Sequence, residues 1–202
     1  MGLMENMVKI RDSLIETEIK KRKSDNRFNI IVASIVAILL FICYLNVFVF
    51  MNVMVSGPSM ERTLSDGDGV IADKSVKAVE PGDIIIIEGV KSDLLIKRVI
   101  AVDKCTVEIR PDGYVYVDGV KIEEPYLNGM LTTPHAYSLP EYARWDLQEG
   151  DIFYLGDNRW VSADSREYGT CTMDNVAGVV MKWSILIKDD FGRMMGSLSS
   201  AG

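Results

Sequence analysis

The sequence predicts a mainly β protein, an antiparallel β-barrel or sandwich domain that follows one N-terminal transmembrane helix. Residues 28–55 contain no charged residue, and about 20 predominantly apolar residues are enough to cross a bilayer. After residue 66, short runs of β-branched residues alternate with Asp-Gly dipeptides, which tight hairpins favour because glycine accepts a positive φ. No convincing helical periodicity interrupts these runs, so antiparallel strands are expected to build the domain.

The charges around the apolar run predict the orientation of the chain. Four consecutive basic residues, 20–23, and Arg27 precede the run, so the positive-inside rule places the N-terminus in the cytoplasm. We expect a cytoplasmic amphipathic helix within 1–27, a transmembrane helix at 28–52 and an extracytoplasmic β-rich domain at 53–202. A cleaved signal peptide is the alternative, but its apolar region would be about 7–15 residues long and end at a small-x-small site. This run is longer and no Ala-x-Ala follows it, so a single-pass protein of the cell membrane is predicted.

Several short runs in the domain have the composition of strands. They are residues 70–72, 83–87, 94–102, 106–110, 114–117, 152–155 and 177–187. Residues 126–148 are rich in proline and tyrosine and are expected to form a loop or a small insertion. Residues 189–202 are polar or small, so a flexible tail is expected there.

Composition and charge exclude several classes of function. The net charge is −7 over 202 residues, and residues 1–27 hold seven basic and five acidic residues, which leaves −9 for the rest of the chain. An acidic domain argues against a nucleic-acid partner, because phosphate neutralisation needs clustered lysine and arginine. None of the three cysteines has C-x-x-C spacing, so no metal site and no cofactor are expected. Cys105 and Cys171 could pair in an oxidising compartment, and this point stays open.

Ser59 lies on a turn a few residues beyond the apolar run. It stands in Ser-Gly-Pro-Ser-Met at 56–60, and glycine with proline constrains a turn so that it can present a hydroxyl outward. A purely structural loop is the alternative for this motif alone. The single histidine, His135, stands in a Thr-Thr-Pro-His loop with no recognisable triad around it. If Ser59 is a nucleophile, a lysine is therefore the expected base.

Lys97 lies inside the apolar run Leu-Leu-Ile-Lys-Arg-Val-Ile at 94–100. A lysine has an ordinary pKa of about 10.4, and burial can lower that pKa by several units. The neutral amine can then take the proton from a serine hydroxyl. Strand alternation places Lys97 and Arg98 on opposite faces, so one side chain can point inward while the other reaches water. The alternative is an edge strand with two exposed basic residues.

A third block, Gly-Asp-Asn-Arg-Trp-Val-Ser-Ala-Asp-Ser-Arg at 156–166, directly follows an expected strand. It offers several hydroxyls and one acid–base pair, Asp164 with Arg166. A charged, hydrogen-bonded loop of this kind typically orients other residues. The alternative is a loop that the Asp–Arg pair merely holds together.

In this order, behind one membrane span, the three blocks resemble the type I signal peptidases of bacteria, membrane-anchored serine endopeptidases with a Ser-Lys dyad. The resemblance rests on residues 56–64, the Gly-Asp-Ile turn at 82–84, the strand at 96–100 and the loop at 156–166. One span and a short chain are similar to the Gram-positive form. The resemblance implies a largely antiparallel β core and cleavage of signal peptides after small-x-small sites. We expect a monomer whose partners are secretory preproteins and the lipid bilayer.

Position by position, the resemblance implies a role for each matching residue. Ser59 matches the nucleophile, Lys97 the general base, and Met60 a residue beside the substrate cleft. Ser162 matches a hydroxyl that helps to orient the lysine amine. Asp164 and Arg166 match a supporting ion pair.

The chain departs from the family pattern around the nucleophile. Gly57 stands where some members carry a serine or threonine that helps to bind the oxyanion, so the hole would depend mainly on backbone donors, the Ser59 N–H first. In an extended chain, Ser56 would face the wrong way to substitute. Glu61-Arg62 replaces the usual proline, which should loosen the turn.

Two other functions are compatible with the same blocks. One is a specialised Ser-Lys protease of the regulator or self-cleaving type, but such relatives are soluble and leave the membrane span without a role. The other is an inactive membrane-anchored binding module of the same fold, against which the presence of both Ser59 and Lys97 counts.

Overall fold

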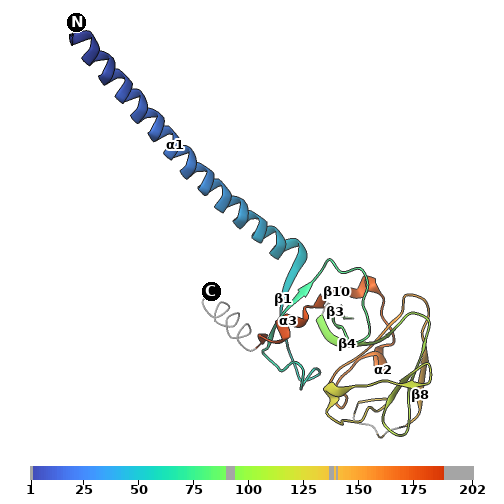
Figure 1. Ribbon diagram of the computed structural model, residues 1–202. Helices are drawn as coiled ribbons and strands as arrows, with labels where there is room; N and C mark the ends of the chain where they lie inside the picture. The colour runs from blue at the N-terminus through green and yellow to red at the C-terminus, as the bar shows by residue number, and fades with distance from the viewer. Residues whose placement is uncertain (1, 90–93, 137–138, 140, 189–202) are drawn as a thin grey trace. The chain divides into compact units, whose positions relative to one another are not determined.

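The computed structural model describes residues 2–89, 94–136, 139 and 141–188. The chain divides into two compact units, Met1–Val47 and Phe48–Gly202, shown in Figure 1. The expected flexible tail at 189–202 lies outside the described residues.

The first unit is built from one long helix. Helix α1 spans Gly2–Tyr44 and continues as a π-helical turn, η1, at Leu45–Val49. The stretch Leu14–Val49 is long and apolar enough to cross a membrane, by length and composition. Two of its polar side chains bond to the carbonyl four residues earlier: the Ser34 hydroxyl donates to the Ile30 carbonyl at 2.9 Å, and the Asn46 amide donates to the Ile42 carbonyl at 3.0 Å. Such internal bonds suit a helix in lipid, because lipid offers polar groups no partner.

The second unit begins with a six-stranded antiparallel sheet. Its strand order is β1-β2-β10-β3-β4-β9. The strands are β1 (Phe50–Met54), β2 (Gly69–Asp73), β3 (Ile84–Glu88), β4 (Leu94–Val102), β9 (Ile152–Leu155) and β10 (Val176–Val180). Strand β4 pairs with β3 along 94–98 but with β9 only from Arg98 onward. Among the described residues, no strand pairs with the outer side of β1 or with the other side of the first half of β4, so we call these two stretches open edges.

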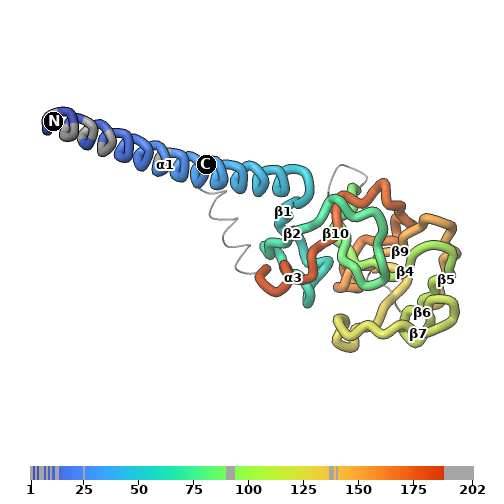
Figure 2. Tube along the Cα trace, turned by 45° about the horizontal axis from the view of Figure 1, so that its top comes forward, coloured from blue at the N-terminus to red at the C-terminus, as the bar shows by residue number. Residues whose placement is uncertain are grey.

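A smaller antiparallel sheet has the strand order β7-β6-β5-β8. Its strands are β5 (Thr106–Ile109), β6 (Val115–Val117), β7 (Val120–Lys121) and β8 (Ala143–Asp146). In Figure 2, β5, β6 and β7 lie together on one side of the second unit, with β1, β2 and α3 (Lys182–Ile185) on the other. The short helices η2 (Pro125–Leu127), α2 (Ser165–Tyr168) and η3 (Met173–Asn175) connect the strands.

Three apolar clusters hold the sheets together. Strand β3 is buried on both faces: Ile84 and Ile86 belong to one cluster, Ile85 and Ile87 to another, which explains its run of four isoleucines. A third cluster joins the sheets and includes Phe153, whose ring lies 5.0 Å from that of Trp145 on β8. The first cluster also contains Met60 and Leu64. It therefore anchors the turn that follows Ser59.

The expected mainly antiparallel β architecture is confirmed, and the two sheets stay open instead of closing into a barrel. The predicted strand at 177–187 is wrong in its second half, because β10 ends at Val180 and helix α3 follows. The Ser184 hydroxyl donates to the Met181 carbonyl at 2.7 Å, a local bond that favours the helical turn over an extended chain.

The structure adds detail to one expected loop and answers the open question of the cysteine pair. The stretch 126–148 ends in strand β8, where Trp145 packs inward between two exposed neighbours. Among the described residues, Cys105 and Cys171 are free thiols. Cys171 lies in the cluster that contains Ile85 and Ile87, and Cys105 packs against the cluster that joins the two sheets.

Candidate active site

A tight turn after β1 carries Ser59. Gly57 has a φ of +84°, a conformation that glycine adopts at little steric cost. Its N–H donates to Asp66 Oδ1 at 2.8 Å, and the Gly67 N–H donates to the Val55 carbonyl at 3.0 Å. These bonds close the loop that presents the Ser59 hydroxyl.

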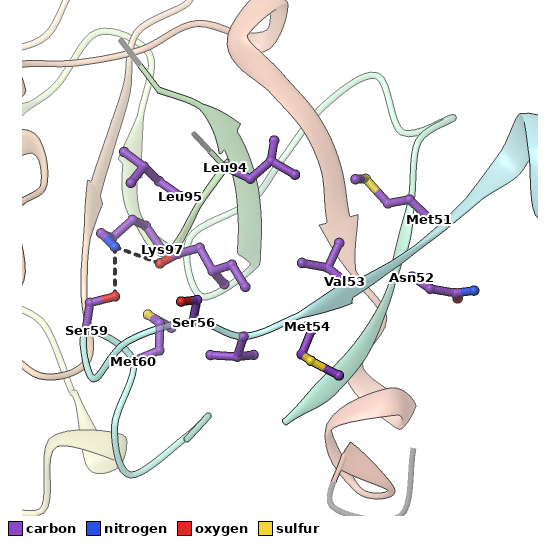
Figure 3. Close-up of a pocket in the computed structure, with 12 residues that line it drawn as sticks. Met51, Asn52, Val53, Met54, Ser56, Ser59, Met60, Leu94, Leu95 and Lys97 are labelled. Atoms are coloured by element: carbon purple, nitrogen blue, oxygen red, sulfur yellow. Dashed lines mark hydrogen bonds between the residues drawn. The ribbon is translucent and has the colours of Figure 1, made fainter. Parts of the chain in front are cut away.

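Lys97 reaches Ser59 from β4. Its Nζ donates to Ser59 Oγ at 2.9 Å and to the Ile96 carbonyl at 2.9 Å, as Figure 3 shows. Only 3% of Lys97 is exposed. Lys97 faces Ser59, while the guanidinium of Arg98 binds Asp157. The expectation that one of the two side chains reaches water is wrong, because only 11% of the Arg98 side chain is exposed and its partner Asp157 is fully buried.

Burial gives Lys97 an unusual acidity. Desolvation lowers the pKa of Lys97 from 10.5 to about 8, an effect that the negative charges of Asp164 and Asp157 oppose and the positive charge of Arg166 assists. With this pKa, roughly one tenth of the amine is neutral at pH 7. The site can therefore supply a base at physiological pH without a histidine.

The loop at 156–166 surrounds a buried ion pair. Asp164 Oδ1 and the Nε of Arg166 lie 2.8 Å apart, with both side chains fully buried. Asp164 also accepts the Gly156 N–H at 3.0 Å, and Arg166 donates to the Ser162 carbonyl at 3.0 Å. The pair thus determines the path of the loop beside Ser59.

Ser162 is buried in this loop, and within the described part of the chain its hydroxyl has no hydrogen-bond partner. The structure therefore places Ser162 near the site but forms no bond between it and Lys97. A Cβ on Gly156 would lie 2.2 Å from Ser162 Oγ and 2.5 Å from the Ser59 carbonyl oxygen. Only glycine allows this close packing of the loop on Ser59.

The sequence alone does not predict a second charged network, which consists of Arg98, Asp157 and Thr63. Arg98 binds Asp157 through two bonds, of 2.8 and 2.6 Å, and the Thr63 hydroxyl donates to the same carboxylate. Asp157 is fully buried. Its place in the charged block at 156–166 was the available signal, but its partners lie 59 and 94 residues away.

The segment 124–133 packs against Arg98 of this network and against the loop at 156–166. Four arginines contact it: Arg62 at the Leu127 carbonyl, Arg98 over the Tyr126 ring, Arg159 at Glu124 and Thr132, and Arg166 at the Thr133 carbonyl. Arg159 is fully buried, and its Nη2 lies 2.5 Å from Glu124. No local pattern in the sequence predicts these contacts.

A cleft of about 580 Å³ opens beside the serine and the lysine. It is lined by residues 51–56, Ser59, Met60 and residues 94–97 (Figure 3). Its walls are the two open strand edges, β1 and the first half of β4. Ser56 also lines the cleft. The positive φ of Gly57 shows that the chain turns directly after Ser56, so the expectation for an extended chain does not apply there. Within the described residues, no group of three or more histidine, cysteine or acidic side chains could hold a metal ion.

Comparison with known proteins identifies relatives over most of the chain. Residues 27–184 match the family "Signal peptidase, peptidase S26". Signal peptidase I of Bacillus licheniformis is 33% identical over 164 residues, which cover 77% of this chain and 87% of that protein. Signal peptidase IB of Staphylococcus aureus is 33% identical, with 75% and 85% covered. Signal peptidase I V of Bacillus subtilis is 30% identical, with 73% and 93% covered. A solved signal peptidase I from Enterococcus faecalis is 29% identical, covers 53% of this chain and 100% of its own, and has a TM-score of 0.45.

Proposed function

The chain belongs to the signal peptidase family, peptidase S26, and on this premise we propose that Ser59 and Lys97 are its catalytic dyad. The protein is a serine endopeptidase of the signal peptidase I kind and cleaves signal peptides. The observation that supports the dyad is the 2.9 Å hydrogen bond between Lys97 Nζ and Ser59 Oγ, made by an amine that is almost fully buried. This distance is within the reach that proton transfer requires.

In the first half of the reaction, neutral Lys97 takes the Ser59 proton while Oγ attacks the carbonyl carbon of the scissile bond. Negative charge develops on the carbonyl oxygen, and the Ser59 N–H is the first donor available to it, since Gly57 offers no hydroxyl. The Lys97 ammonium then gives its proton to the leaving amine, and an ester between Ser59 and the signal peptide remains.

In the second half, Lys97 is neutral again and takes a proton from a water molecule that attacks the ester. The ester bond breaks, the proton returns to Ser59 Oγ, and the signal peptide leaves with a free carboxylate. Asp164 and Asp157 assist because their charges favour the lysine cation that exists between the two transfers.

The substrate binds as an extended strand between the two open edges of the cleft. Main-chain groups of β1 and of residues 94–97 supply the hydrogen bonds, as in other cases of strand addition. Successive side chains of a strand point to opposite sides, so the first and third residues before the cleaved bond enter the cleft together. This explains a requirement for small residues at both positions and tolerance between them.

The membrane helix places the active site close to its substrate. With the basic cluster at 20–23 in the cytoplasm, the catalytic unit lies outside. A secretory preprotein is held in the same bilayer by its signal peptide, which raises its local concentration at the cleft.

Ser162, Asp164 and Arg166 support the dyad from the loop at 156–166, and Met60 forms part of the cleft wall.

Preprotein cleavage by substituted enzymes tests the dyad. We expect Ser59→Ala and Lys97→Met to abolish processing by the full chain in detergent or vesicles, because each variant loses the nucleophile or the base. Lys104→Met is the matched control, since Lys104 is exposed and pairs with Glu149 on the surface. Processing at the normal rate by Lys97→Met would refute the assignment of the base.

A further inference from the structure

Asn158 donates hydrogen bonds to two backbone carbonyl groups, that of Pro58, which precedes the Ser59 N–H, and that of Ser59 itself. Its Nδ2 donates to the Pro58 carbonyl at 3.1 Å, and its backbone N–H donates to the Ser59 carbonyl at 3.0 Å. The acceptor at Pro58 is a carbonyl oxygen, so the amide group of Asn158 must turn its NH₂ toward it. Asn158, which lies in the loop at 156–166, therefore binds both the peptide group before Ser59 and the peptide group after it.

The Pro58 carbonyl also accepts the Glu61 N–H at 3.1 Å, and together with the Asn158 bonds this contact fixes where the Ser59 N–H points. The described peptide bonds include no cis bond, and in a planar trans peptide the carbonyl and the N–H point in opposite directions. Because the Pro58 carbonyl faces Asn158, the Ser59 N–H faces away from the 156–162 loop. The cleft lies on that side: Ser59 lines it, and no residue of 156–162 does. In the described part of the chain, no group accepts a hydrogen bond from this N–H.

We infer that Asn158 is a positioning residue for the oxyanion hole. It holds the 58–59 peptide plane so that the Ser59 N–H is aimed into the cleft before the substrate arrives. The inference rests on the proposed function, since it assigns a task within the same reaction. Asn158 matters more in this chain because Gly57 leaves the hole without a side-chain donor at that position.

The rest of the loop keeps Asn158 rigid. Arg159, its neighbour, is fully buried and donates to the Gly156 carbonyl at 3.0 Å. Gly156 packs so closely on Ser59 that an added Cβ would lie 2.5 Å from the Ser59 carbonyl oxygen. A donor that is fixed in advance stabilises a developing charge better than one that must reorient during the reaction.

The test replaces Asn158 by leucine, which has nearly the same shape and no donor or charge. We expect kcat for a preprotein to fall at least tenfold, because removal of a whole oxyanion donor costs about 10²–10³ in kcat, while KM changes less than twofold. The pH at which activity rises should stay that of the wild type, because the charges around Lys97 are unchanged. Asn158→Ala, which cannot clash, should behave alike, and Gln148→Ala at an exposed amide is the control.

Two inhibitors separate positioning from a structural role. A peptide aldehyde forms a bond from its carbonyl carbon to Ser59 Oγ and places an oxyanion in the hole, so its inhibition constant should rise by the factor lost in kcat. An uncleavable reduced-amide peptide of the same sequence has no such oxygen and should bind as it does to the wild type. Unchanged kcat in both variants, or equal losses for both inhibitors, would overturn the inference. A wild-type chain that cleaves no preprotein would instead refute the proposed function, and the role of Asn158 with it.

Discussion

At the scale of single residues, the proposed chemistry depends on one buried amine and the hydroxyl beside it. Lys97 makes two hydrogen bonds of 2.9 Å, to Ser59 and to the Ile96 carbonyl, and its pKa falls to about 8 because burial disfavours the charge. Asp157 and Asp164 limit this fall, since both raise the pKa of Lys97. In the proposed mechanism, these opposing effects leave part of the amine neutral while they still stabilise the lysine cation between proton transfers.

The activity should therefore rise with pH through the pKa of Lys97. Below about 8, only the neutral fraction of the amine can act, so kcat/KM is expected to increase about tenfold for each pH unit and to level off above the pKa. Initial rates of preprotein cleavage between pH 6 and 10 measure this profile. A profile that is flat, or one that rises only near the ordinary lysine pKa of 10.5, would contradict the buried-base mechanism.

At the scale of elements, the segment 124–133 supports the site from behind the 156–166 loop. Glu124 gives the buried Arg159 its carboxylate partner, and Arg159 donates to the Gly156 carbonyl next to Asp157. The ion pair therefore joins the wall around η2 to the loop that packs on Ser59. Burial makes such a pair expensive to break, because the charge left behind stays out of water.

Glu124→Gln should destabilise the protein by about 3 kcal/mol, since it leaves the Arg159 charge buried without a counter-charge. Chemical unfolding of the full chain in detergent measures the loss. Glu149→Gln is the control, because its pair with Lys104 is exposed at 79% and 72% and should contribute less than about 1 kcal/mol. Equal effects of the two substitutions would show that the buried pair is not a support.

At the scale of the whole molecule, the burial of Lys97, the proposed base, lowers the stability of the fold near neutral pH. Below pH 8, Lys97 is protonated in the native and unfolded chain alike, so the native state carries a buried charge. Between pH 8 and 10.5 the unfolded chain binds more protons than the native one. Stability therefore rises with pH across this window.

Lys97→Met should consequently be more stable than the wild type at pH 7, by about 1–3 kcal/mol after the loss of the lysine hydrogen bonds is subtracted. The advantage should shrink as the pH rises toward 10.5, because the native amine is then neutral and only about half of the unfolded chains still carry the lysine proton. Unfolding of both proteins at pH 7 and pH 10 measures the difference, with Lys104→Met as a lysine control on the surface. An advantage that is the same at both pH values would show that Lys97 is not buried as a cation.

Local sequence patterns predict much of this fold but little of its long-range polar framework. The strand at 94–102 was predicted with its correct bounds, and the Asp-Gly turns have the expected positive φ at Gly67, Gly113 and Gly119. Strand β8 escaped because four alternating residues are too short a signal, and its inward Trp145 is recognisable only once Phe153 packs on it.

The candidate site follows the same division between local and distant information. Ser59 and Lys97 stand out locally and meet in the structure, while their roles stay a prediction. The links from Arg98 to Asp157 and from Arg159 to Glu124 join residues 59 and 35 positions apart. Neither link has a spacing that a single sequence displays, because the sheets bring the partners together only in three dimensions.

The pair of open edges on either side of the cleft has a consequence for timing in secretion. A backbone can bond to β1 and to residues 94–97 at once only if it is uncoiled over several residues. A helical segment, or a segment that already belongs to a folded mature protein, does not offer an extended backbone. If the substrate binds as proposed, the cleft would accept only an unfolded cleavage region, and a preprotein that folds early around that region would remain uncleaved.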